Sequence, residues 1–231
     1  MQPEDSAAVD LWQVRRQRAF KAVPAVGRSV QYLGKYFHVY PDTFWPFIDS
    51  QPLVSSLDIK PGASVLDIGT GSGVIAIHAC YLGAARVLAV DVNPAALRSA
   101  RHNAREHGFN HVMEVRHSDL FDQVGQEQFD VITANLPFRF KSAPDLVAKS
   151  QWDTGFQTNT RFFHHVRSYL KPGGCIYFAH ASFGEPKTIE HLAAQACLSY
   201  QVIASSLTEA ADGREFYAIL MRPEQLDGNH G

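Results

Sequence analysis

Residues 64–73, which read S-V-L-D-I-G-T-G-S-G, constrain the fold of this chain more than any other stretch. The first five form a short apolar run, which is typical of a buried strand in a parallel sheet. Three glycines follow: Gly69, Gly71 and Gly73. The apolar segment that begins at Val74 then predicts a helix. This strand–turn–helix unit is the form in which an open α/β sheet presents backbone N–H groups to a ligand.

The details of the glycine turn indicate which ligand it favours. A dinucleotide fingerprint needs a third glycine three positions after the second, and Val74 stands there instead. Asp67 precedes the first glycine by two residues, where a carboxylate repels a pyrophosphate and attracts a cation. S-adenosylmethionine (SAM) carries an ammonium and a sulfonium. The turn, including Thr70, therefore favours SAM over NAD, and a nicotinamide oxidoreductase is the weaker alternative.

Further strands and helices are expected along the chain. Strand-like runs occupy residues 86–91, 112–115, 129–134, 175–179, 200–205 and 215–221. A short turn at Asp212 and Gly213 joins the last two, which predicts an antiparallel hairpin at the sheet edge. We therefore expect an α/β, Rossmann-like fold: a seven-stranded, mostly parallel sheet with the last strand antiparallel and helices on both faces.

A polar residue stands at the end of each of four expected strands: Asp67, Asp91, Asp119 and Asn135. Ligands of open α/β sheets bind at the carboxyl ends of the strands. Asp91 lies 24 residues after Asp67, close to the spacing of about 20 residues at which an acid grips ribose hydroxyls. Asp119 is expected to accept from an adenine amino group. Leu120 or Val92 is expected to pack against the adenine ring.

The sequence Asn135-Leu-Pro-Phe138 predicts the reaction. The Asn135 side-chain oxygen and a nearby backbone carbonyl can both accept from a planar NH2 group, Pro137 stiffens the turn, and the Phe138 ring can lie on a planar amide or base. Such a site holds a nitrogen lone pair toward the methyl of SAM, so that transfer depends on positioning and electrostatics. We expect Asn135, Pro137 and Phe138 to be the catalytic residues, with Asn135 also binding the cofactor.

The chain divides into three expected parts. Residues 1–58 form an extension that covers the cofactor site, with a helix near residues 6–20, a hairpin at 30–40 centred on Gly34 and Lys35, and a helix at 44–57. Residues 59–224 form the catalytic domain, and residues 225–231 form a flexible tail.

Composition limits the setting of the protein. The formal net charge of -2 over 231 residues makes a nucleic-acid partner less favoured without excluding it. No apolar run is long enough to span a bilayer, and the three widely separated cysteines are typical of a reducing compartment. The eleven histidines have no zinc-type spacing. We expect a cytoplasmic protein with no metal and no membrane contact, of undetermined oligomeric state.

From about residue 60 to 222, the sequence resembles the class I SAM-dependent methyltransferases, through the glycine turn, Asp91 and Asn135-Leu-Pro-Phe138. Within them it is similar to the branch with an (Asn/Asp)-Pro-Pro-(Tyr/Phe) motif, which methylates adenine N6, guanine N2 or protein glutamine. Residues 31–43 are similar to the segment that lies over the cofactor in protein-glutamine methyltransferases. The resemblance implies that Tyr40 and Thr43 contact SAM.

Two departures from the family pattern leave the identity of the methyl acceptor undecided. Leu136 replaces the first proline, and this form also resembles tRNA guanine methyltransferases. Only about 29 residues precede the hairpin, so we expect the helical N-terminal domain of release-factor methyltransferases to be largely missing. The acceptor is therefore expected to be a protein glutamine or a small molecule, with an RNA or DNA base as the alternative. A non-catalytic SAM-binding protein is the alternative of another class.

Overall fold

The structure, a computed structural model, describes residues 3–207 and 214–224, and side chains from residue 6 onward. The helices are α1 (Pro3–Lys21), η1 (Ile48–Ser50), α2 (Gln51–Ser56), α3 (Val74–Tyr81), α4 (Pro94–Glu106), α5 (Leu146–Lys149), η2 (Thr154–Phe156), α6 (Gln157–His165), η3 (Val166–Tyr169) and α7 (Pro186–Gln195). The strands are β1 (Arg28–Tyr32), β2 (Lys35–Val39), β3 (Ser64–Ile68), β4 (Arg86–Asp91), β5 (Met113–His117), β6 (Phe129–Ala134), β7 (Arg139–Phe140), β8 (Trp152–Asp153), β9 (Leu170–Ala181), β10 (Gln201–Leu207) and β11 (Glu215–Met221). The expected Asp212-Gly213 turn and the expected tail lie outside the described residues.

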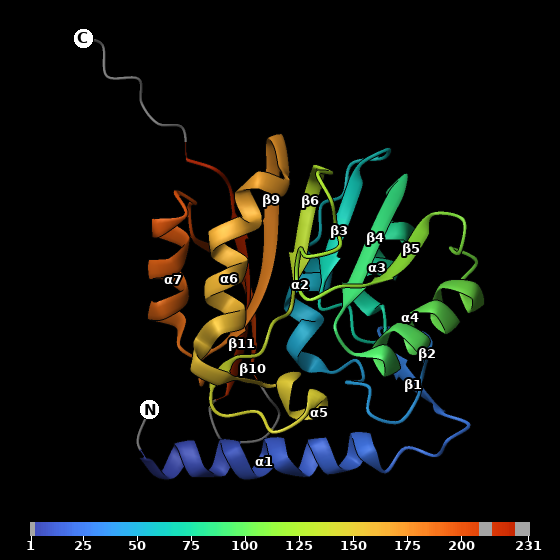
Figure 1. The fold of residues 1–231 in the computed structure, drawn as a ribbon, viewed down its shortest axis with the longest axis vertical. Helices are drawn as coiled ribbons and strands as arrows, with labels where there is room; N and C mark the ends of the chain where they lie inside the picture. The colour runs from blue at the N-terminus through green and yellow to red at the C-terminus, as the bar shows by residue number, and fades with distance from the viewer. Residues whose placement is uncertain (1–2, 208–213, 225–231) are drawn as a thin grey trace.

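The central sheet has seven strands in the order β10-β11-β9-β6-β3-β4-β5 (Figure 1). The pairs β3–β4, β3–β6, β4–β5 and β6–β9 are parallel. The last strand, β11, is antiparallel to both of its neighbours, β9 and β10. The prediction of a mostly parallel sheet with a reversed last strand is confirmed. Strand β10 forms the edge of the sheet, and β11 lies between β10 and β9.

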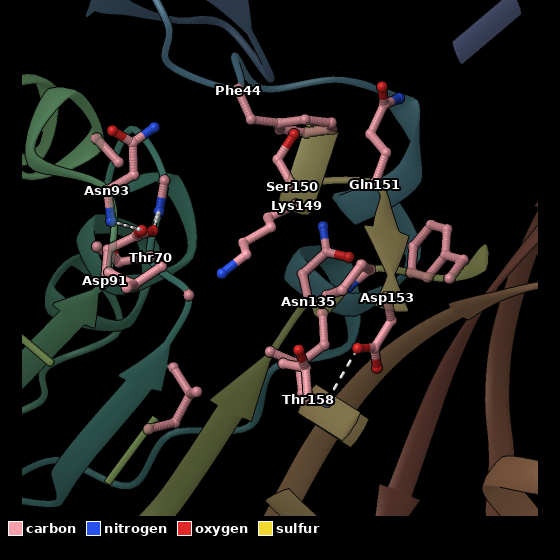
Figure 2. A pocket seen from close by; sticks show the side chains of 18 of the residues that line it. Phe44, Thr70, Asp91, Asn93, Asn135, Lys149, Ser150, Gln151, Asp153 and Thr158 are labelled. Atoms are coloured by element: carbon pink, nitrogen blue, oxygen red, sulfur yellow. Dashed lines mark hydrogen bonds between the residues drawn. The ribbon is translucent and has the colours of Figure 1, made fainter. Parts of the chain in front are cut away.

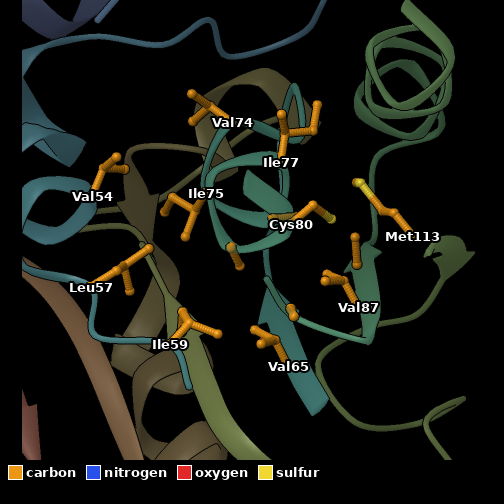
Figure 3. Close-up of a cluster of buried hydrophobic side chains, with 14 of the residues drawn as sticks. Val54, Leu57, Ile59, Val65, Val74, Ile75, Ile77, Cys80, Val87 and Met113 are labelled. Carbon is orange, nitrogen blue, oxygen red and sulfur yellow. The ribbon is translucent and has the colours of Figure 1, made fainter. Parts of the chain in front are cut away.

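Successive residues of the inner strands bury opposite faces of the sheet, as the two-residue period of a strand requires. Val65 and Val87 pack with α2, α3 and α4 on one face (Figure 3). Leu66 and Leu88 pack with α6 and α7 on the other. The prediction of helices on both faces is confirmed. Because both faces are covered, β3 and β4 read as continuous apolar runs.

The segment before the sheet differs from the prediction in two places. The hairpin pairs Tyr32 with Lys35, so its two-residue turn is Leu33-Gly34 rather than Gly34-Lys35. Both turn residues have positive φ angles, 47° and 75°, as a type I′ turn requires. The expected helix at 44–57 is wrong, because residues 44–47 are not helical and only η1 and α2 form. Pro46 lacks an N–H and disfavours a helical conformation for the residue before it.

Helix α1 runs across one end of the sheet (Figure 1). Val9 is buried there among Phe138 and Phe216, which belong to a third apolar cluster. Polar contacts tie α1 to the segment that follows β6. The Trp152 indole donates to Gln13 Oε1 at 2.7 Å, and Arg139 pairs with Asp10 at 3.0 Å. Helix α1 thus encloses the carboxyl ends of the central strands.

Candidate active site

A cavity of about 300 Å³ opens at the carboxyl ends of β3, β4 and β6 (Figure 2), and Trp12 and Gln13 of α1 form part of its wall. Ten of the residues predicted from sequence line it: Gly69, Thr70, Gly71, Asp91, Val92, Asp119, Leu120, Asn135, Pro137 and Phe138. Four do not: Tyr40, Thr43, Asp67 and Gly73. One cavity therefore brings together the expected cofactor and catalytic stretches.

Several backbone N–H groups of the glycine loop donate hydrogen bonds to backbone carbonyls of the protein. The N–H groups of Gly69 and Thr70 both donate to Val90 O at 2.9 Å. The Gly73 N–H donates to Thr70 O at 2.8 Å. Gly73 also has a φ of 84°, and a Cβ there would lie 3.2 Å from Ala100 Cα. The N–H groups of Gly69, Thr70 and Gly73 therefore bond within the protein, and Gly73 is needed for close packing against α4.

Asp91 fastens the loop to the end of β4. Its Oδ2 accepts from the Gly71 N–H at 2.9 Å, and its Oδ1 accepts from the Asn93 N–H at 2.8 Å. Figure 2 shows this arrangement beside Thr70. Burial raises the pKa of Asp91, while the backbone donors lower it. Each carboxylate oxygen still has a free lone pair for a hydroxyl group of a ligand.

Asp67 lies one layer below the cavity. The Thr133 hydroxyl donates to its Oδ1 at 2.7 Å, and its Oδ2 has no partner among the described residues. Burial raises the pKa of Asp67 to about 6. The Thr70 hydroxyl lines the cavity and lies close enough to the Asp67 carboxyl to lower the pKa of that group. The expected direct contact between Asp67 and a ligand is not part of this geometry.

Asp119 lies at the exposed rim of the cavity. Its Oδ2 accepts from Arg161 at 2.9 Å, and the same guanidinium reaches Asp122 at 3.3 Å. Sequence reasoning missed Arg161, which comes from α6, 42 positions away. Leu120 has a φ of 53°, which turns the chain back beneath the cavity.

Tyr40 and Thr43 face α4 instead of the cavity. Thr43 Oγ1 lies 2.9 Å from Ser99 Oγ, and the Tyr40 hydroxyl lies 3.1 Å from His102 Nδ1. These contacts fix the segment so that the next residue, Phe44, lines the cavity. The two residues implied by the family resemblance therefore position the wall of the site.

Asn135 meets a partner that the sequence did not reveal. Its Nδ2 donates to Asp49 Oδ2 at 2.8 Å. Asp49 is on η1, is 3% exposed, and precedes Asn135 by 86 positions. Burial raises the pKa of Asp49 to about 6, while Asn135 and the Arg16 charge lower it. No local sequence signal marks Asp49, because it lies in a short apolar stretch.

Aromatic side chains form much of the cavity wall. These rings come from Trp12, Phe44, Phe47, Phe138, Trp152, Phe183 and Phe216. Polar residues that were not predicted also line it, among them Lys149 and Gln151. Lys149 extends between Asn135 and the loop that carries Thr70 (Figure 2). Gln151 is 5% exposed, and its Oε1 has no partner among the described residues. The part of the cavity around Asn135 can enclose a planar polar group.

Within residues 3–207 and 214–224, no group of three or more His, Cys, Asp or Glu side chains could hold a metal ion. Within the same residues, no helix combines the length and apolarity needed to cross a bilayer.

Comparison with known proteins identifies the family. The family of ribosomal protein L11 methyltransferases (PrmA) matches residues 49–138. A candidate protein N5-glutamine methyltransferase of Methanocaldococcus jannaschii is 31% identical over 161 residues, which cover 67% of this chain and 80% of that protein. The ribosomal protein L11 methyltransferase of Symbiobacterium thermophilum is 46% identical over 78 residues. These cover 34% of this chain but only 25% of the longer relative.

The fold agrees with a solved methyltransferase. The 16S rRNA N2 G1207 methyltransferase of Thermus thermophilus, solved with SAM and guanosine, superposes with a TM-score of 0.63 at 20% identity. The match covers 86% of this chain and 50% of that one. The chain therefore belongs to the class I SAM-dependent methyltransferases and carries a PrmA-like methyltransferase domain.

Proposed function

We propose that the protein methylates the nitrogen of a primary carboxamide, that of a protein glutamine side chain. The observation that carries this proposal is the hydrogen bond from Asn135 Nδ2 to Asp49. It leaves Asn135 Oδ1 as an acceptor at the cavity wall, where a planar NH2 group can donate to it. The N5-glutamine activity in the name of the Methanocaldococcus relative supports the same acceptor chemistry.

The residues of the cavity fit SAM better than a dinucleotide. Four loop N–H groups are already bonded, those of Gly69, Thr70, Gly71 and Gly73. A pyrophosphate would therefore find few donors there. The carboxylates of Asp67 and Asp91 lie below and beside the loop, where they favour a cationic ligand.

Each part of SAM has a proposed partner. We assign the ribose hydroxyls to Asp91, the adenine ring to Val92 and Leu120, and its amino group to Asp119. We assign the amino acid end to the part of the loop at Thr70, with Asp67 acting through the loop or a water molecule. When bound, SAM would supply an electrophilic methyl group: the S–CH3 bond breaks as the N–CH3 bond forms, the neutral thioether product remains, and the methylated nitrogen releases one proton to water.

The residues around Asn135 would bind and orient the acceptor. Asn135 Oδ1 accepts one N–H of the carboxamide, and the Phe138 ring supports its plane. Pro137 fixes the backbone between them. The acceptor nitrogen is thereby held for an in-line approach, and positioning supplies most of the catalysis.

In this proposal, residues 1–58 cover the site and residues 59–224 form the catalytic domain.

The test is methyl transfer from tritium-labelled SAM into bacterial lysate. SAM binding is measured first by isothermal titration calorimetry. Aliquots of the lysate are then treated with protease or nuclease, and labelled protein is hydrolysed to identify N5-methylglutamine. Label lost with protease and recovered as N5-methylglutamine is the expected result. SAM binding without any transfer indicates a non-catalytic SAM-binding protein, and no SAM binding at all refutes the proposal.

Methylation of an RNA or DNA base is the second candidate. Leu136 in place of the first motif proline favours it, and so does the exposed Lys149 ammonium at the cavity, which could contact a phosphate. The net charge of -2 provides little attraction for a polyanion. Label lost with nuclease supports this candidate, and label that survives both treatments at low mass indicates a small-molecule acceptor.

A further inference from the structure

Asp49 is a buried carboxylate that contacts the proposed catalytic amide. Its Oδ2 lies 2.8 Å from Asn135 Nδ2, and its side chain belongs to η1 instead of the strand ends that form the rest of the site. Only 3% of the residue is exposed. Burying a carboxylate is costly unless it is hydrogen-bonded, so a buried acid in this place needs an explanation.

The bond restricts how Asn135 can present its side chain. An ionised carboxylate only accepts hydrogen bonds, so the Nδ2 group of Asn135 must face Asp49. The Oδ1 atom is then turned away from Asp49. Without such a partner, the amide could rotate and present its NH2 group instead. Two NH2 groups that face each other cannot form a hydrogen bond, and the acceptor would be misplaced.

The surroundings keep Asp49 ionised at neutral pH. Burial raises its pKa to about 6, which still leaves a carboxylate at pH 7 and above. Arg16 of α1 opposes the effect of burial with its positive charge. The Arg16 guanidinium lies over the Phe47 ring, 3.8 Å from its centroid, two residues before Asp49. Helix α1 therefore supplies the charge that favours the acceptor form of Asp49.

We infer that Asp49 is a positioning residue that holds the Asn135 amide with its oxygen toward the methyl acceptor. The catalytic consequence of this inference rests on the proposed function, whereas the orientation of the amide does not. Through Asp49 of η1, the charge of Arg16 on α1 therefore acts on Asn135 at the end of β6. This role is separate from cofactor binding, because Asp91 and the glycine loop lie on the neighbouring strands β3 and β4.

The orientation can be measured without any acceptor. Protein labelled with ¹⁵N-asparagine gives side-chain NH2 signals, and Asn135→Ala identifies those of Asn135. We expect these protons to exchange with solvent at least tenfold more slowly than the NH2 protons of exposed asparagines. Asp49→Leu should remove this protection, and Asp49→Asn, which can still accept through its carbonyl, should retain part of it. Tyr32→Phe is the matched control, because it breaks the buried Tyr32–Ser50 contact beside Asp49 and leaves Asn135 untouched.

The catalytic consequence is measured with the peptide acetyl-Ala-Gln-Ala-amide and labelled SAM. We expect Asp49→Leu to lower kcat by about 10- to 100-fold, the range for loss of one charge-assisted hydrogen bond. The Kd for SAM should stay within about twofold. Asp49→Asn should recover part of kcat, and Tyr32→Phe should retain it. A role confined to stability would instead lower the melting temperature of Tyr32→Phe and Asp49→Leu alike without separating their kcat values.

Three results would overturn the inference: fast exchange of the Asn135 NH2 in the wild type, wild-type kcat in Asp49→Leu, or an equal loss of SAM affinity and kcat. If the wild type methylates neither the peptide nor any lysate protein, the proposed function fails. The exchange measurement still decides whether Asp49 holds Asn135.

Discussion

Asp91→Ala should weaken SAM binding by about 100-fold. The Asp91 carboxylate accepts two backbone N–H groups, those of Gly71 at 2.9 Å and Asn93 at 2.8 Å. A hydrogen bond to a charged group contributes about 1.5–3 kcal/mol. Because the site is half-buried and water can replace part of each bond, the lower figure applies. The two ribose hydroxyls that we assign to Asp91 would form two such bonds on binding, and at about 1.5 kcal/mol each they correspond to about two powers of ten in affinity.

The assay is isothermal titration of SAM into wild type, Asp91→Ala and Asp91→Asn. The asparagine variant can accept only one of the two N–H groups, so its affinity should fall between the others. Asp130→Ala is the control, because Asp130 also accepts a backbone N–H at a strand, that of Ser64 at 2.8 Å, but at the opposite end of the sheet. It should lose stability and keep its SAM affinity. An Asp91→Ala variant that binds SAM within threefold of wild type would refute the reasoning.

Three other substitutions test separate parts of the structure. Asn135→Ala should leave the Kd for SAM within about threefold and lower kcat at least 100-fold, measured with labelled SAM; a loss of SAM affinity equal to that of Asp91→Ala contradicts its assigned role. Asp67→Asn should stabilise the ligand-free protein by about 1–2 kcal/mol at pH 7 and by almost nothing at pH 4, measured by urea unfolding. Folding raises the pKa of Asp67 from 3.8 to about 6, so its destabilising effect is absent in acid and complete above pH 6; lower stability of the variant at pH 7 contradicts this. Trp152→Phe should cost about 1–3 kcal/mol in urea unfolding, because it leaves the buried Gln13 carbonyl unpaired, and the added change Gln13→Met should recover part of that loss. Equal stability of Trp152→Phe and wild type would show that the bond contributes nothing.

The central sheet could be predicted because its signals are local. Strands β4 and β6 begin and end where their apolar runs do, at Arg86–Asp91 and Phe129–Ala134. Their burial on both faces leaves no alternating pattern to misinterpret. The expected helix at 44–57 failed for an equally local reason, since Pro46 interrupts it. The apolar and aromatic composition of residues 44–57 correctly indicated that the segment is buried, but it did not justify the prediction of one continuous helix.

The residues of the candidate site could be predicted where they stand at strand ends, but not where segments distant in the sequence meet. Asp91 and Asn135 could be predicted because they stand at the ends of β4 and β6. Asp49 and Arg161 could not, because their partners are 86 and 42 positions away. Tyr40 shows the converse limit. The family resemblance placed its segment at the site, but only the three-dimensional contacts show that its side chain turns to α4.

The attachment of α1 has a consequence for the order in which the two halves of the cavity form. Gln13 and Trp152 are 139 positions apart, whereas Gly71 and Asp91 are only 20 apart. Closing a long loop costs more chain entropy and is slower than pairing neighbouring segments. During synthesis, the part of the cavity at Gly71 and Asp91, which we assign to the cofactor, can therefore form first. The part enclosed by Gln13 and Trp152, which we assign to the acceptor, is then still open. A newly made chain is expected to enclose an acceptor only after residue 152 has left the ribosome and α1 has docked.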